Sequence, residues 1–182
     1  MNEPVLFVLA HPDLFASRAN KRMAEIAAAT DGVRVYDLYA EFPDMFVHGA
    51  DARSAFDGVE ALVVQNPLYW YAGPGLLKEW FDRTFIAGWA YGRGGKALKG
   101  KRYLASVTTG SAAEAYRVGG RHGNPVEDYL KPYRQIAEFC QMRWQDPLVL
   151  HHARSISDDE LDQHAQLLKQ RLETLAAGSA NS

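Results

Sequence analysis

Short continuous apolar runs alternate with amphipathic segments along this chain, and that alternation restricts the fold more than any other feature of the sequence. The run ALVVQ at 61–65 is apolar almost throughout, as expected of a strand buried on both faces. The segment 74–85 that follows carries large apolar residues at helical spacing, namely Leu76, Leu77, Trp80, Phe81 and Phe85. Strands of this kind connected by helices predict a parallel sheet with helices on both faces.

The same pattern recurs from one end of the chain to the other. Strands are predicted at residues 5–10, 33–38, 61–65, 103–107 and 147–151. Helices are predicted at residues 17–29, 50–56, 74–85, 126–141 and 157–175. Ser17 can cap the first helix, and Ser157 with Glu160 forms a capping box for the last. The pattern does not contain the strand order, but the flavodoxin-like order 2-1-3-4-5 is a common arrangement of five parallel strands, and we predict it here.

Length and composition indicate one globular domain. With 182 residues, 47% of them hydrophobic, the chain can bury one sizeable core, which we assign to residues 1–177, with a disordered tail at 178–182. The net charge of −2 provides no basic surface for nucleic acid. The single cysteine, Cys140, excludes an intramolecular disulfide, and the histidines are too scattered to predict a metal site. No apolar stretch approaches 18 residues, so we expect a cytoplasmic protein.

Three predicted strand ends carry the candidate site. The first is followed by His11 and by Ser17, Arg18, Ala19 and Asn20 at a helix start, where free amides and the helix dipole favour an anion such as phosphate. The third delivers an aromatic loop with Tyr69, Trp70 and Tyr71, and the fourth delivers Thr108, Thr109, Gly110 and Ser111. In a sheet of order 2-1-3-4-5 these strands are neighbours, so the loops are expected to meet. The alternative is that the aromatic rings only cap the core.

Several motifs, in this order, resemble one family. They are AHPxxxxSxAN at 10–20, NPLYWYAGPGLLKEWFDRTF at 66–85, GWAYGRGGKALKGK at 88–101, TTG at 108–110 and AYRVGGRHG at 115–123. Together they resemble the flavodoxin-like NAD(P)H:quinone oxidoreductases, the DT-diaphorase superfamily, and within it the bacterial ancillary proteins of glutathione-regulated potassium-efflux systems. The resemblance covers nearly the whole chain, from Val5 to the last helix.

The resemblance implies a flavin cofactor, FMN or alternatively FAD, with NADH or NADPH as electron donor. It places phosphate contacts on Ser17 to Asn20 with His11 nearby. It places flavin-ring contacts on Pro67, Leu68, Tyr69, Trp70 and Tyr71 and on Thr108, Thr109, Gly110 and Ser111. Many relatives have a glycine where this chain has Ser111, which puts a close backbone approach there in doubt.

Tyr116 and His122 match the tyrosine and histidine, six residues apart, that lie beside the flavin in quinone reductases of the superfamily. A phenol and an imidazole can donate or share a proton there, which would make them the catalytic pair. The alternative is a packed loop tyrosine and a solvated histidine. Relatives are homodimers, and Phe46, Trp89 and Tyr91 are candidate exposed aromatics for such an interface.

The predicted activity is therefore two-electron, ping-pong reduction of quinones or similar electrophiles by NAD(P)H. A second hypothesis is a regulatory subunit that binds the cytoplasmic domain of a potassium-efflux antiporter, which would place it at the inner face of the membrane. A third is a flavodoxin-like electron carrier. The first two are compatible with each other.

Overall fold

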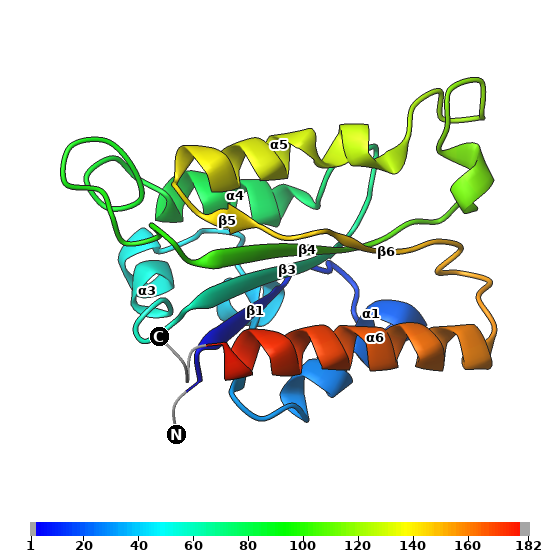
Figure 1. Ribbon diagram of the computed structural model, residues 1–182, viewed down its shortest axis with the longest axis horizontal. Coiled ribbons are helices and arrows are strands. Elements are labelled where there is room, and N and C mark those ends of the chain that lie inside the picture. Colours follow the sequence, from blue (N-terminus) through cyan, green and yellow to red (C-terminus); the bar gives the residue numbers. More distant parts are fainter. Residues whose placement is uncertain (1–2, 179–182) are drawn as a thin grey trace.

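The computed structural model describes residues 3–178 and consists of one parallel sheet between two layers of helices (Figure 1). The predicted tail lies outside the described residues except for Gly178, which is the C-cap of the last helix. No helix within the described part of the chain is long and apolar enough to cross a membrane.

The sheet has the predicted order. Its strands are β1 (Val5–Leu9), β2 (Val33–Asp37), β3 (Ala61–Pro67), β4 (Arg102–Thr108), β5 (Arg143–Trp144) and β6 (Leu148–Leu150). The order is β2-β1-β3-β4-β5, β6 also pairs with β4, and every pairing is parallel. The flavodoxin-like order is therefore confirmed.

The outermost strand differs in detail from the prediction. The run predicted at 147–151 is β6, which pairs with the carboxyl half of β4, and β5 pairs with the amino half. The two pieces form one interrupted edge, broken at residues 145–147. The sequence did not reveal β5 because two residues, Arg143 and Trp144, are too few to show a periodicity.

The helices divide between the two faces of the sheet. On one face lie α1 (Arg18–Ala28) and α6 (Asp158–Ala177), and on the other lie α2 (Leu38–Glu41), α3 (Gly49–Ser54), α4 (Gly75–Thr84) and α5 (Val126–Phe139). Between β2 and the expected short helix lies α2, which was not predicted and whose first residue, Leu38, was assigned to the preceding strand. Asp37 caps α2 by accepting a hydrogen bond from the Tyr39 amide at 3.0 Å.

The core follows from the alternation of side chains along the strands. Leu6 and Val8 of β1 point to the face covered by α4 and α5, and Val5, Phe7 and Leu9 point to the face covered by α1 and α6. All five are almost completely buried, which is why this strand reads as a continuous apolar run. Each such side chain contributes roughly 1.5–3 kcal/mol when fully buried.

Both predicted helix caps are present. Ser17 accepts a hydrogen bond from the Asn20 amide at the start of α1, and Ser157 and Glu160 form the reciprocal capping box of α6. The caps fix where these helices begin. Because α1 follows β1 and α6 follows β6, the loops that precede the two helices lie at the edge of the sheet where the strands have their carboxyl ends. In Figure 1 this edge is on the right, where the strand arrows end.

Candidate functional site

The first turn of α1 presents groups suited to an anion. Within residues 3–178, the backbone N–H groups of Arg18 and Ala19 donate to no protein acceptor, and no acidic residue occupies this turn. The Ser17 hydroxyl oxygen accepts from the Asn20 amide at 3.3 Å and from its side chain at 3.0 Å, which leaves the hydroxyl proton to donate. Two amides and a hydroxyl at the positive end of a helix are a suitable phosphate site.

Asn20 lies beneath this turn and joins three elements. Its side chain is 2% exposed, donates to Thr108 Oγ1 at 3.1 Å and accepts from Gln65 Nε2 at 2.7 Å. The bonds connect α1 to the ends of β3 and β4. Asn20 was predicted to contact a ligand phosphate, but its amide is already occupied by protein partners, so its role in this structure is to support the loops.

Arg18 was also predicted as a phosphate contact, and its side chain turns elsewhere. The guanidinium forms an ion pair with Asp158 at 2.8 Å and donates to the Ile156 carbonyl. Both partners lie at the start of α6. Arg18 thus ties α6 to α1, and its backbone amide is the part that faces the anion site.

The aromatic loop after β3 is a tight two-residue turn. The Tyr69 amide donates to the Ala72 carbonyl at 2.7 Å, and the Ala72 amide donates to the Tyr69 carbonyl at 3.0 Å. The residues between them, Trp70 and Tyr71, have φ of 49° and 67°. Two positive φ values define a type I′ turn, which normally carries Asn or Gly. Left-handed backbone in a bulky residue is unfavourable and is concentrated at functional sites. Trp70 is 94% exposed, so the turn presents its ring to solvent.

His11 connects this turn to the first loop. Its Nδ1 accepts from the Asp13 amide at 3.1 Å, so the ring proton is on Nε2, which lies 3.3 Å from the Tyr69 hydroxyl. Burial lowers the pKa of His11, which keeps the imidazole neutral near pH 7. A neutral donor at this position holds Tyr69 without adding charge beside the anion site.

The loop after β4 meets the aromatic turn. The Leu68 amide donates to the Thr108 carbonyl at 2.8 Å, which fixes the two strand ends together. In the described part of the chain, four amides of the two loops donate to no protein acceptor: those of Trp70, Tyr71, Gly110 and Ser111. The amides of Leu68, Tyr69 and Thr109 are used within the protein. The four available donors can hydrogen-bond the carbonyl oxygens and nitrogens of a heterocycle.

Tyr116 and His122 lie together at the end of the segment that follows. Their rings stack with centroids 4.3 Å apart. His122 Nε2 is 2.9 Å from Ser111 Oγ, and its Nδ1 is 3.3 Å from the Tyr71 hydroxyl. Burial raises the pKa of Tyr116, so its phenol remains protonated well above neutral pH. The structure therefore brings a phenol donor and an imidazole to the tip of the aromatic turn.

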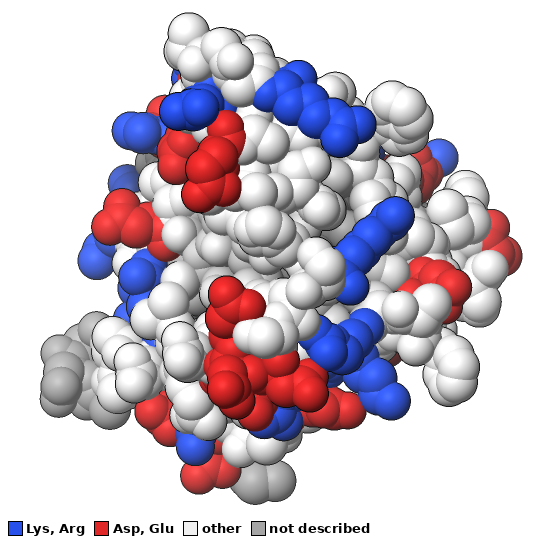
Figure 2. Space-filling view, turned by 90° about the vertical axis from the view of Figure 1, so that its right-hand side faces the viewer, with Lys and Arg blue, Asp and Glu red and all other residues white. Residues whose placement is uncertain are grey.

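A cleft of about 260 Å³ lies between these loops. Its walls are Leu68, Trp70, Tyr71, Tyr116, Arg121 and His122. Figure 2 looks onto this edge of the molecule, where uncharged side chains form the centre and charged groups lie around it. A planar ligand could therefore rest against aromatic and polar walls with a single cation, Arg121, at the side.

His151 also belongs to this neighbourhood, although no sequence pattern distinguishes it from the other scattered histidines. It follows β6, and its Nδ1 is 3.0 Å from Thr109 Oγ1. Its ring centroid is 5.6 Å from that of Tyr116. Only the pairing of β6 with β4 brings these residues together, and that pairing is not readable from the sequence.

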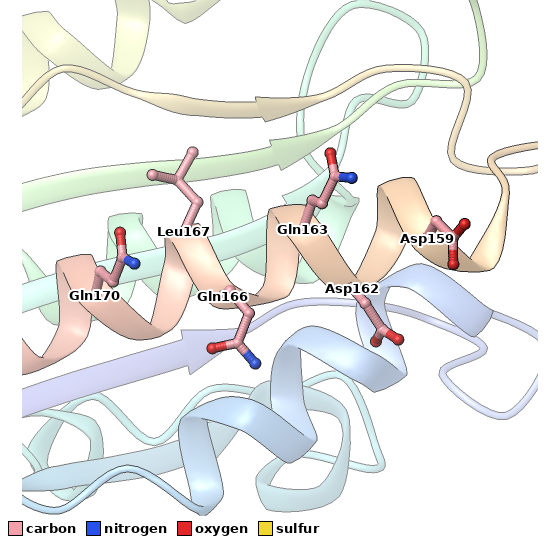
Figure 3. A pocket seen from close by; sticks show the side chains of 6 residues that line it. All are labelled: Asp159, Asp162, Gln163, Gln166, Leu167 and Gln170. Carbon is pink, nitrogen blue, oxygen red and sulfur yellow. The ribbon is translucent and has the colours of Figure 1, made fainter.

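A second hollow, of about 610 Å³, lies along α6 (Figure 3). It is lined by Asp159, Asp162, Gln163, Gln166, Leu167 and Gln170. These side chains come from one helix and are spread along it rather than converging on a point. The cleft at the sheet edge, where several elements converge on one space, is the better candidate.

The expected interface aromatics are only partly exposed. Phe46 is 47% exposed, as expected. Trp89 and Tyr91 pack against the core, Trp89 with Phe56 at a centroid distance of 5.4 Å. The expectation that both are exposed was wrong, because the loop after α4 folds back onto the helix layer, where Trp89 also contacts Phe85 and Tyr91 contacts Phe139.

A doubly wound sheet of order 2-1-3-4-5, with three loops joined at the carboxyl ends of its central strands, defines a flavodoxin-like α/β protein. The chain belongs to this family, because the sequence model described as flavodoxin-like fold matches residues 3–172. It is similar to the glutathione-regulated potassium-efflux system ancillary protein KefG of Yersinia enterocolitica. The two are 39% identical over 181 residues, covering 98% of each chain.

Two solved structures are similar as well. The general stress protein 14 of Treponema denticola, in complex with FMN, is 33% identical with a TM-score of 0.87, covering 94% of this chain and 98% of that one. An NADPH-quinone reductase from P. pentosaceus is 23% identical with a TM-score of 0.84, covering 92% and 96%, and at that identity the likeness concerns the fold alone. Solved neighbours of this chain thus include a flavoprotein and a quinone reductase.

Proposed function

We propose that this protein is an FMN-dependent NAD(P)H:quinone oxidoreductase that also acts as an ancillary subunit of a potassium-efflux antiporter. The observation that supports the enzymatic part best is the set of free hydrogen-bond donors at three loops that meet at one edge of the sheet. The similarity to an FMN complex supports the choice of cofactor.

The residues fit the cofactor in chemistry and in position. The amides of Arg18 and Ala19 and the Ser17 hydroxyl would hold the phosphate, because they are unclaimed donors at a helix N-terminus. The amides of Trp70, Tyr71, Gly110 and Ser111 would hold the polar edge of the flavin ring, and Trp70 would lie against it. A side chain at Gly110 would meet nothing within 4 Å, so this loop also leaves space.

FMN, when bound, would take two electrons from NAD(P)H and pass them to the acceptor. The chain would orient the rings, exclude water and supply protons. Tyr116 is suited to act as a donor in the cleft, because burial raises its pKa and so keeps the phenol protonated, and because its ring lines the wall. His122, held by Ser111 and Tyr71, is suited to share that proton.

The first test is the identity and chemistry of the cofactor. Purified protein is expected to be yellow, to release FMN rather than FAD on denaturation, and to oxidise NADH or NADPH with a quinone. Tyr116→Phe is expected to slow quinone reduction while leaving nicotinamide binding nearly unchanged, and Tyr91→Phe, remote from the cleft, is its control. A colourless protein that cannot be reconstituted with either flavin would disprove the proposal.

The ancillary role is supported by a different observation, the 39% identity to KefG over nearly the whole chain. It predicts binding to the cytoplasmic part of a potassium-efflux antiporter, and so a location at the inner face of the membrane. Potassium efflux should be measured with wild type and with Tyr116→Phe. If both activate the transporter equally, regulation does not depend on catalysis; if neither binds it, the ancillary role is wrong.

A homodimer is part of the proposal, since the cleft is open and Trp70 is exposed beside it. Sedimentation of the FMN-bound protein is expected to give the mass of two chains. A monomer at all concentrations would contradict this. An electron carrier is the competing function, and reactions limited to single-electron transfer would support it.

A further inference from the structure

His151 lies behind the cleft wall and reaches it through Thr109 and through the ring of Tyr116. It is half-buried after β6, it is absent from the cleft walls, and its Nδ1 is 3.0 Å from Thr109 Oγ1. The Thr109 hydroxyl donates to the Ser111 carbonyl at 2.9 Å. Because a hydroxyl has one proton, His151 is the donor in its bond to Thr109, and its ring proton is on Nδ1.

Thr109 also reaches the tyrosine of the cleft. The side-chain hydroxyls of Thr109 and Ser111 both interact with the Tyr116 phenol, and the rings of Tyr116 and His151 are in contact, with centroids 5.6 Å apart. Thr109 itself is 1% exposed and its amide donates to the Leu150 carbonyl at 2.9 Å, so its position is fixed by the sheet. An immobile oxygen thus lies between an imidazole and a phenol.

We propose that His151 is a positioning residue for Tyr116, acting through the Thr109 hydroxyl to hold the phenol oxygen at the cleft wall. The inference rests on the proposed function, since Tyr116 is the proton donor there. A fixed hydroxyl matters because a proton donor displaced by about 1 Å can lower a rate by roughly two orders of magnitude. His122 cannot replace this contact, because its nitrogens face Ser111 and Tyr71.

The same chain of contacts transmits the charge of His151 to Tyr116. Charged groups around His151 come from several elements: His152 beside it, Glu114 from the segment before Tyr116, Glu127 from α5 and His164 from α6. Burial is the largest influence and lowers the pKa of His151. It is therefore neutral at pH 7 and gains a positive charge only in more acid solution, close enough to Tyr116 to be sensed there.

The variants separate the contact from the titration. Thr109→Val removes the hydroxyl at nearly constant volume, and Thr109→Ser restores it. His151→Leu removes the donor, whereas His151→Asn keeps a hydrogen-bonding group that does not titrate. His152→Asn is the matched control, because it changes the exposed histidine next in the chain.

The first readout needs neither cofactor nor turnover. In FMN-free protein with ¹³C-labelled tyrosine, the Tyr116 Cζ resonance is expected to shift as His151 titrates. This coupling should be lost in His151→Asn, weakened in Thr109→Val because only the ring contact at 5.6 Å remains, and retained in Thr109→Ser and His152→Asn. A Tyr116 resonance that ignores His151 in wild type would overturn the proposal.

The second readout is quinone reduction by the FMN-bound protein. His151→Leu and Thr109→Val are expected to lower kcat about tenfold or more with KM changed by less than about twofold, and Thr109→Ser is expected to recover most of the loss. Turnover at the wild-type rate in His151→Leu would overturn the proposal, as would an equal loss in His152→Asn. If wild type itself reduces no quinone, the proposed function fails, and the NMR coupling decides the role of His151. If Thr109→Val does not fold, the two His151 variants carry the test.

Discussion

The turn that presents Trp70 to solvent predicts that replacing this residue will stabilise the protein while weakening its cofactor site. Left-handed backbone costs a residue with a side chain roughly 1–2 kcal/mol, and Trp70 has φ of 49°. Glycine removes that strain but adds about 0.5–1 kcal/mol of conformational freedom to the unfolded chain. Little packing is lost, because Trp70 is 94% exposed. Trp70→Gly should therefore raise the free energy of unfolding by up to about 1.5 kcal/mol.

Two companion variants separate strain from packing. Trp70→Ala keeps the strain and loses only the exposed ring, so its stability should lie within about 0.5 kcal/mol of wild type. Tyr71→Gly relieves the same kind of strain at φ of 67°, but it loses the contact between the Tyr71 and Tyr129 rings at 4.9 Å. Tyr71→Gly should therefore be less stable than Trp70→Gly.

The assay is equilibrium unfolding in urea of protein from which FMN has been removed, because a bound ligand would add its own stabilisation. FMN affinity is then measured separately by fluorescence quenching. Loss of the Trp70 ring should weaken it by about 0.5–1.5 kcal/mol, which is roughly a two- to tenfold increase in Kd. If Trp70→Gly is less stable than Trp70→Ala, the turn is not strained; if FMN affinity is unchanged in both, the ring does not contact the flavin.

Three further predictions concern the supports of the site and its helices. Asn20→Ala should lower the free energy of unfolding by about 2–4 kcal/mol, since it leaves buried partner groups on β3 and β4 unsatisfied. In the same urea titration, Lys21→Ala on the exposed side of the helix should change the free energy of unfolding little. Burial lowers the pKa of His164 below its ordinary 6.5, so the unfolded chain binds more protons in acid and stability should fall from pH 7 to pH 5. Unfolding curves of His164→Gln should show a smaller fall, and a fall equal to that of wild type would contradict the prediction. Hydrogen bonds from Ser157 lower the pKa of Glu160, so its contribution is present above its ordinary pKa and is lost as pH falls through the lowered value. Thermal unfolding should thus separate Glu160→Gln from wild type at pH 7 and bring them together in strongly acid solution, and a constant difference would argue against the cap.

The fold was predictable because the strands that carry it are buried on both faces. Runs such as Val5 to Leu9 have no polar residue to obscure them, and the helices between them have clear caps or periodic apolar faces. The prediction missed α2 and β5, which have four and two residues, about one helical turn and one strand period, so no repeating pattern can show in them. Short elements of this kind are decided by tertiary contacts.

The candidate site was predictable in location and less so in detail. Parallel topology brings together loops that follow neighbouring strands, so Trp70, Thr108 and Ser17 could be assigned to one edge. Which groups remain available could not be predicted, because it depends on partners distant in sequence, as when Gln65 and Thr108 occupy the Asn20 amide. Nor does YWYA indicate a type I′ turn, since it contains neither Asn nor Gly at the central positions.

The interruption of the outermost strand affects how these molecules meet one another. A long, straight edge strand offers a row of unpaired amides and carbonyls on which a foreign strand can be added. Here β5 and β6 have two and three residues, and the break between them contains Asp146 and Pro147. A charge and a residue without an amide proton stop a ladder from extending past this point, so this margin of the sheet is protected against templated aggregation.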